Sequence, residues 1–212
     1  MFPKKSPSVL NVVIEGLTLG ARAGIAKVIL DLSKLAVGFP TIESLAIANQ
    51  ETVLKYWEGL GFYKRAINMH NSAKVIIKNN NGVFPNNFDD LIALKGVGKS
   101  TANAILIFGF GKKLAILDAN VKRVIKRVFN IKSQSRRDNE KFLWILSEKL
   151  LPKFKIKDYT QALMDFGSLV CKPINPECAK CDLFKLCKYI VRNAIKAENI
   201  NDPASPKKCF PV

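Results

Sequence analysis

Acidic residues are scarce in this sequence, and their scarcity is its strongest compositional bias. The 212 residues include 17 Asp and Glu against 34 Lys and Arg, which gives a formal net charge of +17 at pH 7. This imbalance does not determine a fold, but it favours a polyanionic partner, either nucleic acid or an anionic membrane surface. Hydrophobic residues make up 48% of the chain, which is enough to build a core, so we do not expect wholesale disorder.

Long apolar runs are also absent. No stretch approaches the roughly 20 uninterrupted apolar residues that cross a bilayer. The first residues, MFPKKSPSVLN, lack the apolar core and cleavage site of a signal peptide. A membrane is therefore the less favoured of the two candidate partners, and we expect none. We expect a cytoplasmic protein, associated with the nucleoid if its source is bacterial.

Cysteine is missing from the first 170 residues, and four of the five cysteines then fall within seventeen residues. Disulfides that staple a fold are not distributed in this way, and in a reducing compartment such a cluster more often holds a metal. The four candidate ligands are separated by six, two and five residues. Zinc and a four-iron cluster both accept four thiolates, and the spacing excludes neither. The candidate ligands are Cys171, Cys178, Cys181 and Cys187.

Strand-like alternation is nearly absent, whereas apolar residues recur at three-four spacing along most of the chain. This periodicity is typical of amphipathic helices, and it predicts an all-α protein with short loops. The final segment, residues 191–212, departs from the pattern, and we expect a basic, disordered tail there.

A glycine-rich turn interrupts two of the predicted helices, in the segment LIALKGVGKSTANAIL at residues 91–106. Gly96 and Gly98 permit a tight left-handed backbone and leave nearby amides unobstructed. Amides at a helix N-terminus, here with Lys99 beside them, favour a phosphate. An ordinary pair of helices with a glycine C-cap explains the glycines equally well, and the net charge tilts the choice toward phosphate.

Asp118 stands between an apolar run and an apolar-periodic helix, in the segment AILDANVKRVIKRVF. This position predicts a helix N-cap, where a carboxylate is stabilised and kept ionised. An ionised carboxylate can also stabilise an oxocarbenium-like centre or orient a water molecule. The basic run from Lys122 to Arg127 is either a solvated helix face or a surface close to DNA, and its proximity to Asp118 favours DNA.

These segments, in this order, resemble the helix-hairpin-helix/Gly-Pro-Asp superfamily of base-excision DNA glycosylases, and most closely its MutY-type adenine glycosylases. The resemblance covers about residues 25–190. It implies a two-lobed helical fold, in which residues 9–113 form a six-helix barrel with the helix-hairpin-helix and residues 114–190 form a helical domain around a [4Fe-4S] cluster. The four cysteines would ligate this cluster. The segments that carry the resemblance are YWEGLGFYKRAINMH (56–70), LKGVGKSTANAI (94–105), LDANVKRV (117–124) and YTQALMDFGSLVCKPINPECAKCDLFKLC (159–187).

The resemblance implies base excision from double-stranded DNA that contains a mispair or a damaged base, by a monomeric enzyme. The target nucleotide would rotate into a pocket, because its glycosidic bond cannot be reached inside the stack. Phe62 occupies the position of the family's wedge tyrosine, with Tyr63 beside it; the alternative is that both rings are core. Lys172 and Lys180 would then lie against the DNA backbone.

The resemblance also assigns residues to the reaction. Asp118 matches the catalytic aspartate, and Ser100 matches the position at which the endonuclease III branch carries its Schiff-base lysine. A serine cannot form an imine with the sugar C1′. Lys99 is one residue from Ser100, which places it ~100° further around the helix, so its side chain should point elsewhere. The sequence therefore predicts a monofunctional glycosylase without strong lyase activity.

The general acid is where the sequence departs from the family. MutY-type enzymes protonate adenine with a glutamate, and residues 13–25 here read VIEGLTLGARAGI. Ungapped alignment places Leu17 at that position, whereas a two-residue insertion brings Glu15 there. MutY-type enzymes also carry a C-terminal domain that senses oxidised guanine, whereas the sequence here ends 25 residues after Cys187. A·G mispairs, a thymine/uracil mismatch or endonuclease III-like activity, and a catalytically weakened iron–sulfur DNA-binding module therefore stay open.

Overall fold

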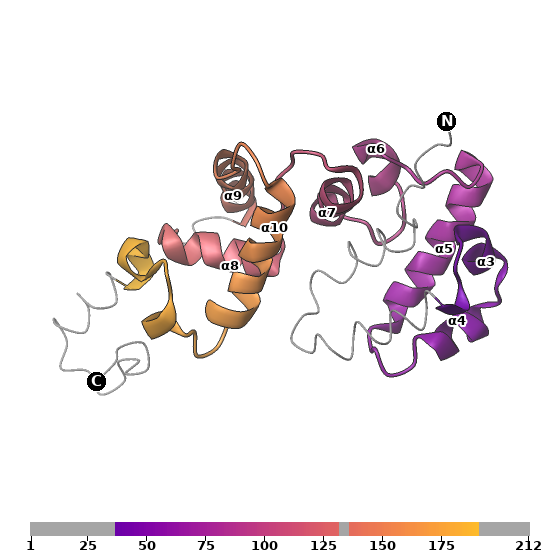
Figure 1. Ribbon diagram of the computed structural model, residues 1–212, viewed down its shortest axis with the longest axis horizontal. Helices are drawn as coiled ribbons and strands as arrows, with labels where there is room; N and C mark the ends of the chain where they lie inside the picture. Colours follow the sequence, from indigo (N-terminus) through magenta and orange to yellow (C-terminus); the bar gives the residue numbers. More distant parts are fainter. Residues whose placement is uncertain (1–36, 132–135, 191–212) are drawn as a thin grey trace. The chain divides into compact units, whose positions relative to one another are not determined.

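The computed structural model describes residues 37–131 and 136–190, and every regular element in these ranges is a helix (Figure 1). The prediction of an all-α protein is confirmed, because the three-four spacing of apolar residues leaves each helix one face to bury. Glu15 and the tail at 191–212 lie outside the described residues. The chain divides into two compact units, Met1–Leu114 and Ala115–Val212, which we describe separately.

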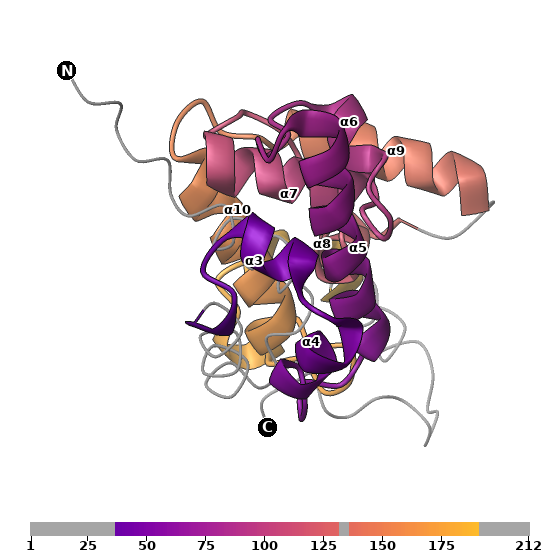
Figure 2. The ribbon, with the colours of Figure 1, turned by 90° about the vertical axis from the view of Figure 1, so that its right-hand side faces the viewer.

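The first unit is built around one long helix, α5 (Tyr63–Asn80). The shorter helices α3 (Ile42–Ile47) and α4 (Gln50–Tyr56) pack against it, and Figure 2 shows them beside it. Thr41 and Asn49 cap the N-termini of these two helices with their side chains. This capping compensates for their shortness, since helices of six or seven residues are marginal without tertiary contacts. The core that results contains Phe39, Leu45, Ala46, Val53, Trp57, Ala66, Met69 and Ala73.

The C-terminal part of α5 contributes to a second core together with α6 (Phe88–Ile92) and α7 (Lys99–Phe110). Asn87 caps α6 by accepting a hydrogen bond from the Asp90 amide at 2.9 Å. This core fixes the loop between α6 and α7, which contains the two glycines of the sequence motif. Its members are Ile76, Phe84, Leu91, Leu94, Ala102, Ile105 and Leu106.

The second unit contains α8 (Ala119–Val128), α9 (Arg136–Lys149) and α10 (Ile156–Asp165). Helix α10 continues directly into the π-helical η2 (Phe166–Val170), whose C-cap is the first cysteine. The short 3₁₀ turns η3 (Cys178–Lys180) and η4 (Phe184–Leu186) complete the cysteine segment. A Cβ on Gly167 would lie 2.8 Å from the Asn120 Cβ, so only glycine allows η2 to approach α8 this closely.

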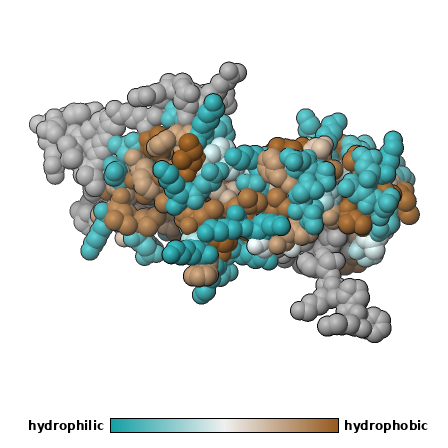
Figure 3. All heavy atoms as spheres, turned by 90° about the horizontal axis from the view of Figure 1, so that it is seen from above, coloured by the Kyte–Doolittle hydropathy of each residue, from teal (hydrophilic) through white to brown (hydrophobic). Residues whose placement is uncertain are grey.

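On the face that Figure 3 shows, brown apolar side chains lie among teal hydrophilic ones. Within residues 37–131 and 136–190, none of the helices combines the length and apolarity needed to cross a bilayer.

Candidate nucleic-acid-binding and catalytic site

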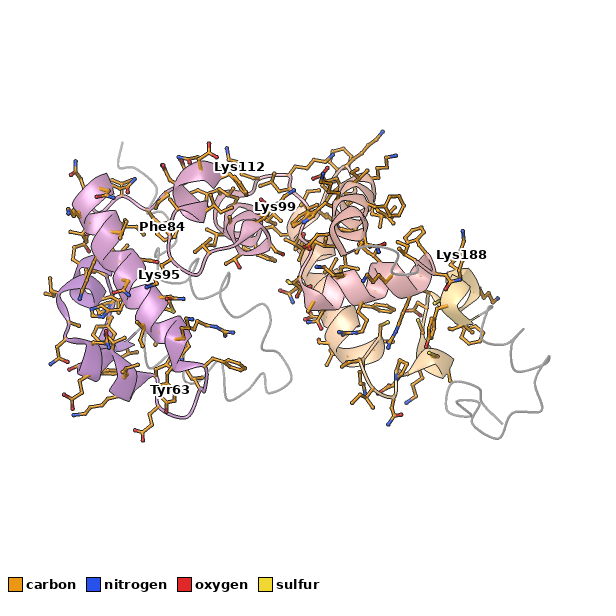
Figure 4. All side chains as sticks on the ribbon, turned by 180° about the vertical axis from the view of Figure 1, so that it is seen from behind. Tyr63, Phe84, Lys95, Lys99, Lys112 and Lys188 are labelled. Atoms are coloured by element: carbon orange, nitrogen blue, oxygen red, sulfur yellow. The ribbon has the colours of Figure 1, made fainter. Side chains whose placement is uncertain are left out.

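The loop between α6 and α7 has the left-handed turn that the sequence predicts, but at only one of its two glycines. Gly96 has φ +86°, whereas Gly98 is extended, with φ −96° and ψ 173°. The prediction is therefore confirmed for Gly96 and wrong for Gly98, which serves instead as the N-cap of α7. No side chain caps this helix, and a Cβ on Gly98 would meet only open space. The N-terminus of α7 is accessible, and Figure 4 shows Lys95 and Lys99 at this hairpin.

Gly96 is constrained by conformation and by space together. A Cβ at this residue would lie 2.3 Å from Nδ2 of Asn68 on α5, in a backbone conformation that side chains rarely adopt. We expect Gly96→Ala to lower the free energy of unfolding by about 1–3 kcal/mol. Gly98→Ala is the matched control and should cost less than about 1 kcal/mol, since only the N-cap preference is lost. Urea denaturation measures both, and equal losses would contradict this account of the turn.

Phe62 and Tyr63 lie on the surface, so the alternative that both rings are core is wrong. Phe62 is 79% exposed and Tyr63 is 46% exposed. Phe62 has φ 48°, a left-handed conformation that is uncommon for a bulky residue, and it precedes the first turn of α5. Trp57 Nε1 donates to the Gly61 carbonyl oxygen at 2.8 Å and thereby ties down the turn before it. The packing holds an aromatic ring out in solvent.

Arg65 is a residue of this site that the sequence interpretation missed. Its guanidinium carbon lies 5.7 Å from the centroid of the Phe62 ring, within the range of a cation–π contact. The two residues are three apart along the chain, a spacing that brings helical side chains together and that could have indicated the contact. Burial lowers the pKa of the Arg65 guanidinium, which nevertheless stays charged at neutral pH.

Asp118 caps α8, as its place in the sequence predicts. Its Oδ1 accepts a hydrogen bond from the Val121 amide at 2.7 Å. Burial raises the pKa of Asp118 above its ordinary value, although hydrogen bonds from the Val121 and Asn120 amides and the charge of Arg123 act to lower it. The direction is opposite to the one expected for a helix N-terminus alone, because burial outweighs the cap. The carboxylate is therefore more basic than an exposed aspartate.

Ser100 and Lys99 begin α7, where Ser100 is half-buried and Lys99 is exposed. They belong to the first unit together with Phe62 and the hairpin, whereas Asp118 and the cysteines belong to the second. The structure thus places the predicted residues in two groups, each described within its own unit. Glu15 lies outside the described residues.

All four cysteines of the predicted metal site line one cavity in the second unit. Cys187 is buried and the other three are half-buried. Within the described ranges, no three Cys, His, Asp or Glu side chains are gathered closely enough to hold a metal ion. Burial raises the pKa of the Cys181 thiol, and the nearby Cys171 and Cys187 thiols raise it further. The donor set suits a soft thiolate-binding metal or cluster, whose positive charge would offset the repulsion among four thiolates. The apolar side chains of the cavity wall include Phe166, Val170, Leu183 and Ile190.

Two arginines of the basic run donate hydrogen bonds within the second unit, so the interpretation of this run as a solvated helix face is wrong for them, whereas its proximity to DNA stays a prediction. Arg123 donates from Nε to the Cys171 carbonyl at 2.8 Å and from Nη2 to Asn120 Oδ1 at 2.9 Å and to the Gly167 carbonyl. Arg127 contacts the same loop. Their i, i+4 spacing predicts a shared helix face, but it does not tell which way that face points.

The two lysines predicted to contact DNA differ in their surroundings. Lys172 forms an ion pair with Glu177 at 2.5 Å, which lowers the pKa of that glutamate. Lys180 is exposed on η3. Of the two, Lys180 is the more accessible to a phosphate, because contact through Lys172 would compete with its own carboxylate partner.

The family model described as HhH-GPD superfamily base excision DNA repair protein matches residues 21–149, a range that contains both the hairpin and Asp118. The chain belongs to this superfamily. An adenine DNA glycosylase of Buchnera aphidicola subsp. Baizongia pistaciae is 40% identical over 173 residues, which are 82% of this chain and 48% of that protein. The chain therefore spans about half the length of this relative.

Two further comparisons cover most of this chain and most of the other. A thymine/uracil-DNA glycosylase of Methanothermobacter thermautotrophicus is 36% identical over 84% of this chain and 80% of that protein. The solved structure of a thermostable thymine-DNA glycosylase superposes with a TM-score of 0.76 at 33% identity, covering 89% of this chain and 86% of the other. The superfamily scaffold thus extends beyond residue 149, into the cysteine segment.

Proposed function

We propose that this protein is a monofunctional DNA glycosylase that removes adenine mispaired with oxidised guanine or with guanine. The observation that carries the proposal is the half-buried Asp118 carboxylate at the N-cap of α8, in a chain whose sequence is similar to that of an adenine DNA glycosylase. A carboxylate held by the Val121 amide keeps a defined orientation, which the stabilisation of a transient cation requires.

DNA binding in this proposal begins at the hairpin. The exposed N-terminus of α7, with Lys95 and Lys99 beside it, would hold a phosphate of the backbone without recognising sequence. The exposed Phe62 ring would enter the base stack, and it needs no hydroxyl for this, since a flat apolar face suffices. The target adenine would then leave the stack and enter the site of Asp118.

The reaction breaks the bond between the sugar C1′ and the adenine nitrogen. A general acid supplies a proton to the departing base, and positive charge develops on the sugar. The Asp118 carboxylate stabilises that charge and orients a water molecule. The water oxygen bonds to C1′ and releases a proton, so that the products are free adenine and an abasic site. Because Ser100 cannot form an imine with C1′, no strand cleavage follows.

We further propose that Cys171, Cys178, Cys181 and Cys187 hold a [4Fe-4S] cluster. The four cysteines line one cavity, and thiolates are the ligands that such clusters take. Zinc also takes four thiolates, and the resemblance to a family whose four-cysteine pattern ligates a [4Fe-4S] cluster favours the cluster. The bound cluster would supply structure to the cysteine segment, which carries Lys180, and no step of the excision passes through it.

Glu15 is the proposed general acid. Glu15→Gln should lower the single-turnover rate of adenine release by roughly 10²–10⁴-fold, because glutamine cannot donate the proton that the departing base needs. Binding of mispaired duplex should be unchanged, which gel-shift titration measures. An unchanged excision rate would remove Glu15 from the mechanism and leave the general acid to another residue.

A panel of duplexes containing A·oxidised G, A·G, T·G and U·G tests the proposed substrate. Single-turnover incubation followed by alkali should cleave the two adenine duplexes and leave the other two intact. Faster cleavage of T·G and U·G would favour the thymine/uracil activity of the Methanothermobacter relative. Binding of all four duplexes without cleavage of any would favour a non-enzymatic iron–sulfur module.

Borohydride added to abasic-site duplex should trap no covalent complex, and efficient trapping would contradict the monofunctional mechanism.

A further inference from the structure

Arg127, in the last turn of α8, is directed at the cysteine cavity and contacts its first candidate ligand. Its Nη1 lies 3.5 Å from Cys171 Sγ, in hydrogen-bonding geometry. The same nitrogen donates to the Lys172 carbonyl oxygen at 2.6 Å, and Nη2 donates to the Pro173 carbonyl oxygen at 3.1 Å. One guanidinium thus holds three consecutive residues of the loop that starts at Cys171.

Arg127 also contacts the other end of the cysteine segment. The Cys187 thiol donates to the Arg127 carbonyl oxygen at 3.7 Å. The Tyr189 ring centroid lies 5.6 Å from the guanidinium carbon, so the arginine also stacks on the residue two positions after the last cysteine. Residues at both ends of the segment, Cys171 and Cys187, are therefore tied to the same residue of α8.

The charge of Arg127 suits this position. Among the described residues that line the cavity, Arg127 is the one that carries a positive charge. Four thiolates bring four negative charges into a partly buried space, and an N–H donor to sulfur stabilises the charged form of a thiolate. Arg123, one turn earlier, reaches carbonyl and amide oxygens by the contacts given above, whereas Arg127 reaches the sulfur itself.

We propose that Arg127 is a positioning residue for the cysteine-bound cofactor: its guanidinium holds the loop after Cys171 and the Tyr189 ring, at the two ends of the cysteine segment, and hydrogen-bonds to the Cys171 sulfur. The inference rests on the proposed iron–sulfur cluster. Residues that orient metal ligands typically contribute 10–100-fold to affinity. The planar guanidinium fork, and not charge alone, makes the contacts to Sγ and the two carbonyls, so lysine should replace it only in part.

The test compares R127Q, R127K and K126Q in the full chain after anaerobic reconstitution with iron and sulfide. Lys126 is the control, because it is the adjacent cation of α8 and is not among the cavity-lining residues. We expect R127Q to lose iron to a chelator about 10-fold faster than the unaltered chain, R127K to fall between the two, and K126Q to match the unaltered chain. The midpoint potential of the retained cluster should also shift in R127Q and R127K, since a donor to sulfur is lost.

Equal rates of iron loss in all four proteins would overturn the role of Arg127. Equal losses in R127Q and K126Q would assign the effect to helix charge and would also overturn it. If R127Q does not fold, as judged by circular dichroism, the comparison of R127K with K126Q decides. An unaltered chain that takes up no iron would refute the proposed cofactor, and the inference with it, which separates that failure from a failure of Arg127 alone.

Discussion

Asp118→Asn is expected to lower the single-turnover rate of adenine excision by roughly 10²–10³-fold while the fold is retained. Asparagine is as good an N-cap as aspartate, so the hydrogen bond from the Val121 amide persists. What is lost is the negative charge that would stabilise the developing cation. Asp158→Asn is the matched control, because Asp158 is another aspartate at the start of a helix in the same unit, and its variant should retain full activity.

The same substitution has a pH-dependent effect on stability, and its sign follows from burial. Because the pKa of Asp118 is raised in the folded state, the folded chain binds that proton more tightly than the unfolded chain. Its contribution to stability is fully present below the pKa of an unfolded aspartate and is lost as the pH rises through the raised pKa. Asparagine does not ionise, so Asp118→Asn should be at least as stable as the unaltered chain at neutral pH.

Urea denaturation at neutral pH and at about pH 4, close to the ordinary aspartate pKa, measures the difference in stability between Asp118→Asn and the unaltered chain. The advantage of the asparagine variant should shrink at the lower pH. A variant that is less stable at neutral pH than the unaltered chain would contradict the burial argument, whatever its activity. A fully active Asp118→Asn enzyme would exclude Asp118 from the chemistry and would remove the main support for the proposed function.

The second large effect is expected at the cysteine cavity. The double variant Cys178→Ala/Cys181→Ala removes two of the four proposed ligands, so iron bound per chain should fall by about tenfold or more, together with the visible absorbance of the cluster. Thermal stability should fall as well, since the free energy of metal binding is also free energy of folding. Iron analysis and circular dichroism measure the two effects.

Cys209→Ala is the matched control for this pair, because it removes a thiol from the same chain without touching the four-cysteine segment. It should leave iron content and melting temperature unchanged. If the double variant retains its iron and Cys209→Ala loses it, the ligand assignment is wrong. If neither variant affects a bound metal, the four cysteines are not its ligands.

Several features could be predicted from the sequence because each depends on residues within one or two turns of each other. Apolar spacing predicts the helices, since a helical face repeats every three to four residues. Asp118 is recognisable as an N-cap from its neighbours alone. The turn at Gly96 follows from the absence of a side chain. The grouping of four cysteines within seventeen residues likewise needs no tertiary structure to suggest one shared site.

Only the tertiary structure decided how those features are oriented, because the deciding contacts join residues far apart in the chain. Arg127 and Cys171 are 44 residues apart, and no local pattern tells that the arginine turns inward to the cavity. Burial reverses the shift in the pKa of Asp118 that its helix N-terminus alone predicts. Phe62 could have been core or surface by sequence, and packing left its ring in solvent. Local sequence determined which groups are present, whereas burial, which depends on the whole fold, determined the direction of the Asp118 pKa shift and the accessibility of the Phe62 ring.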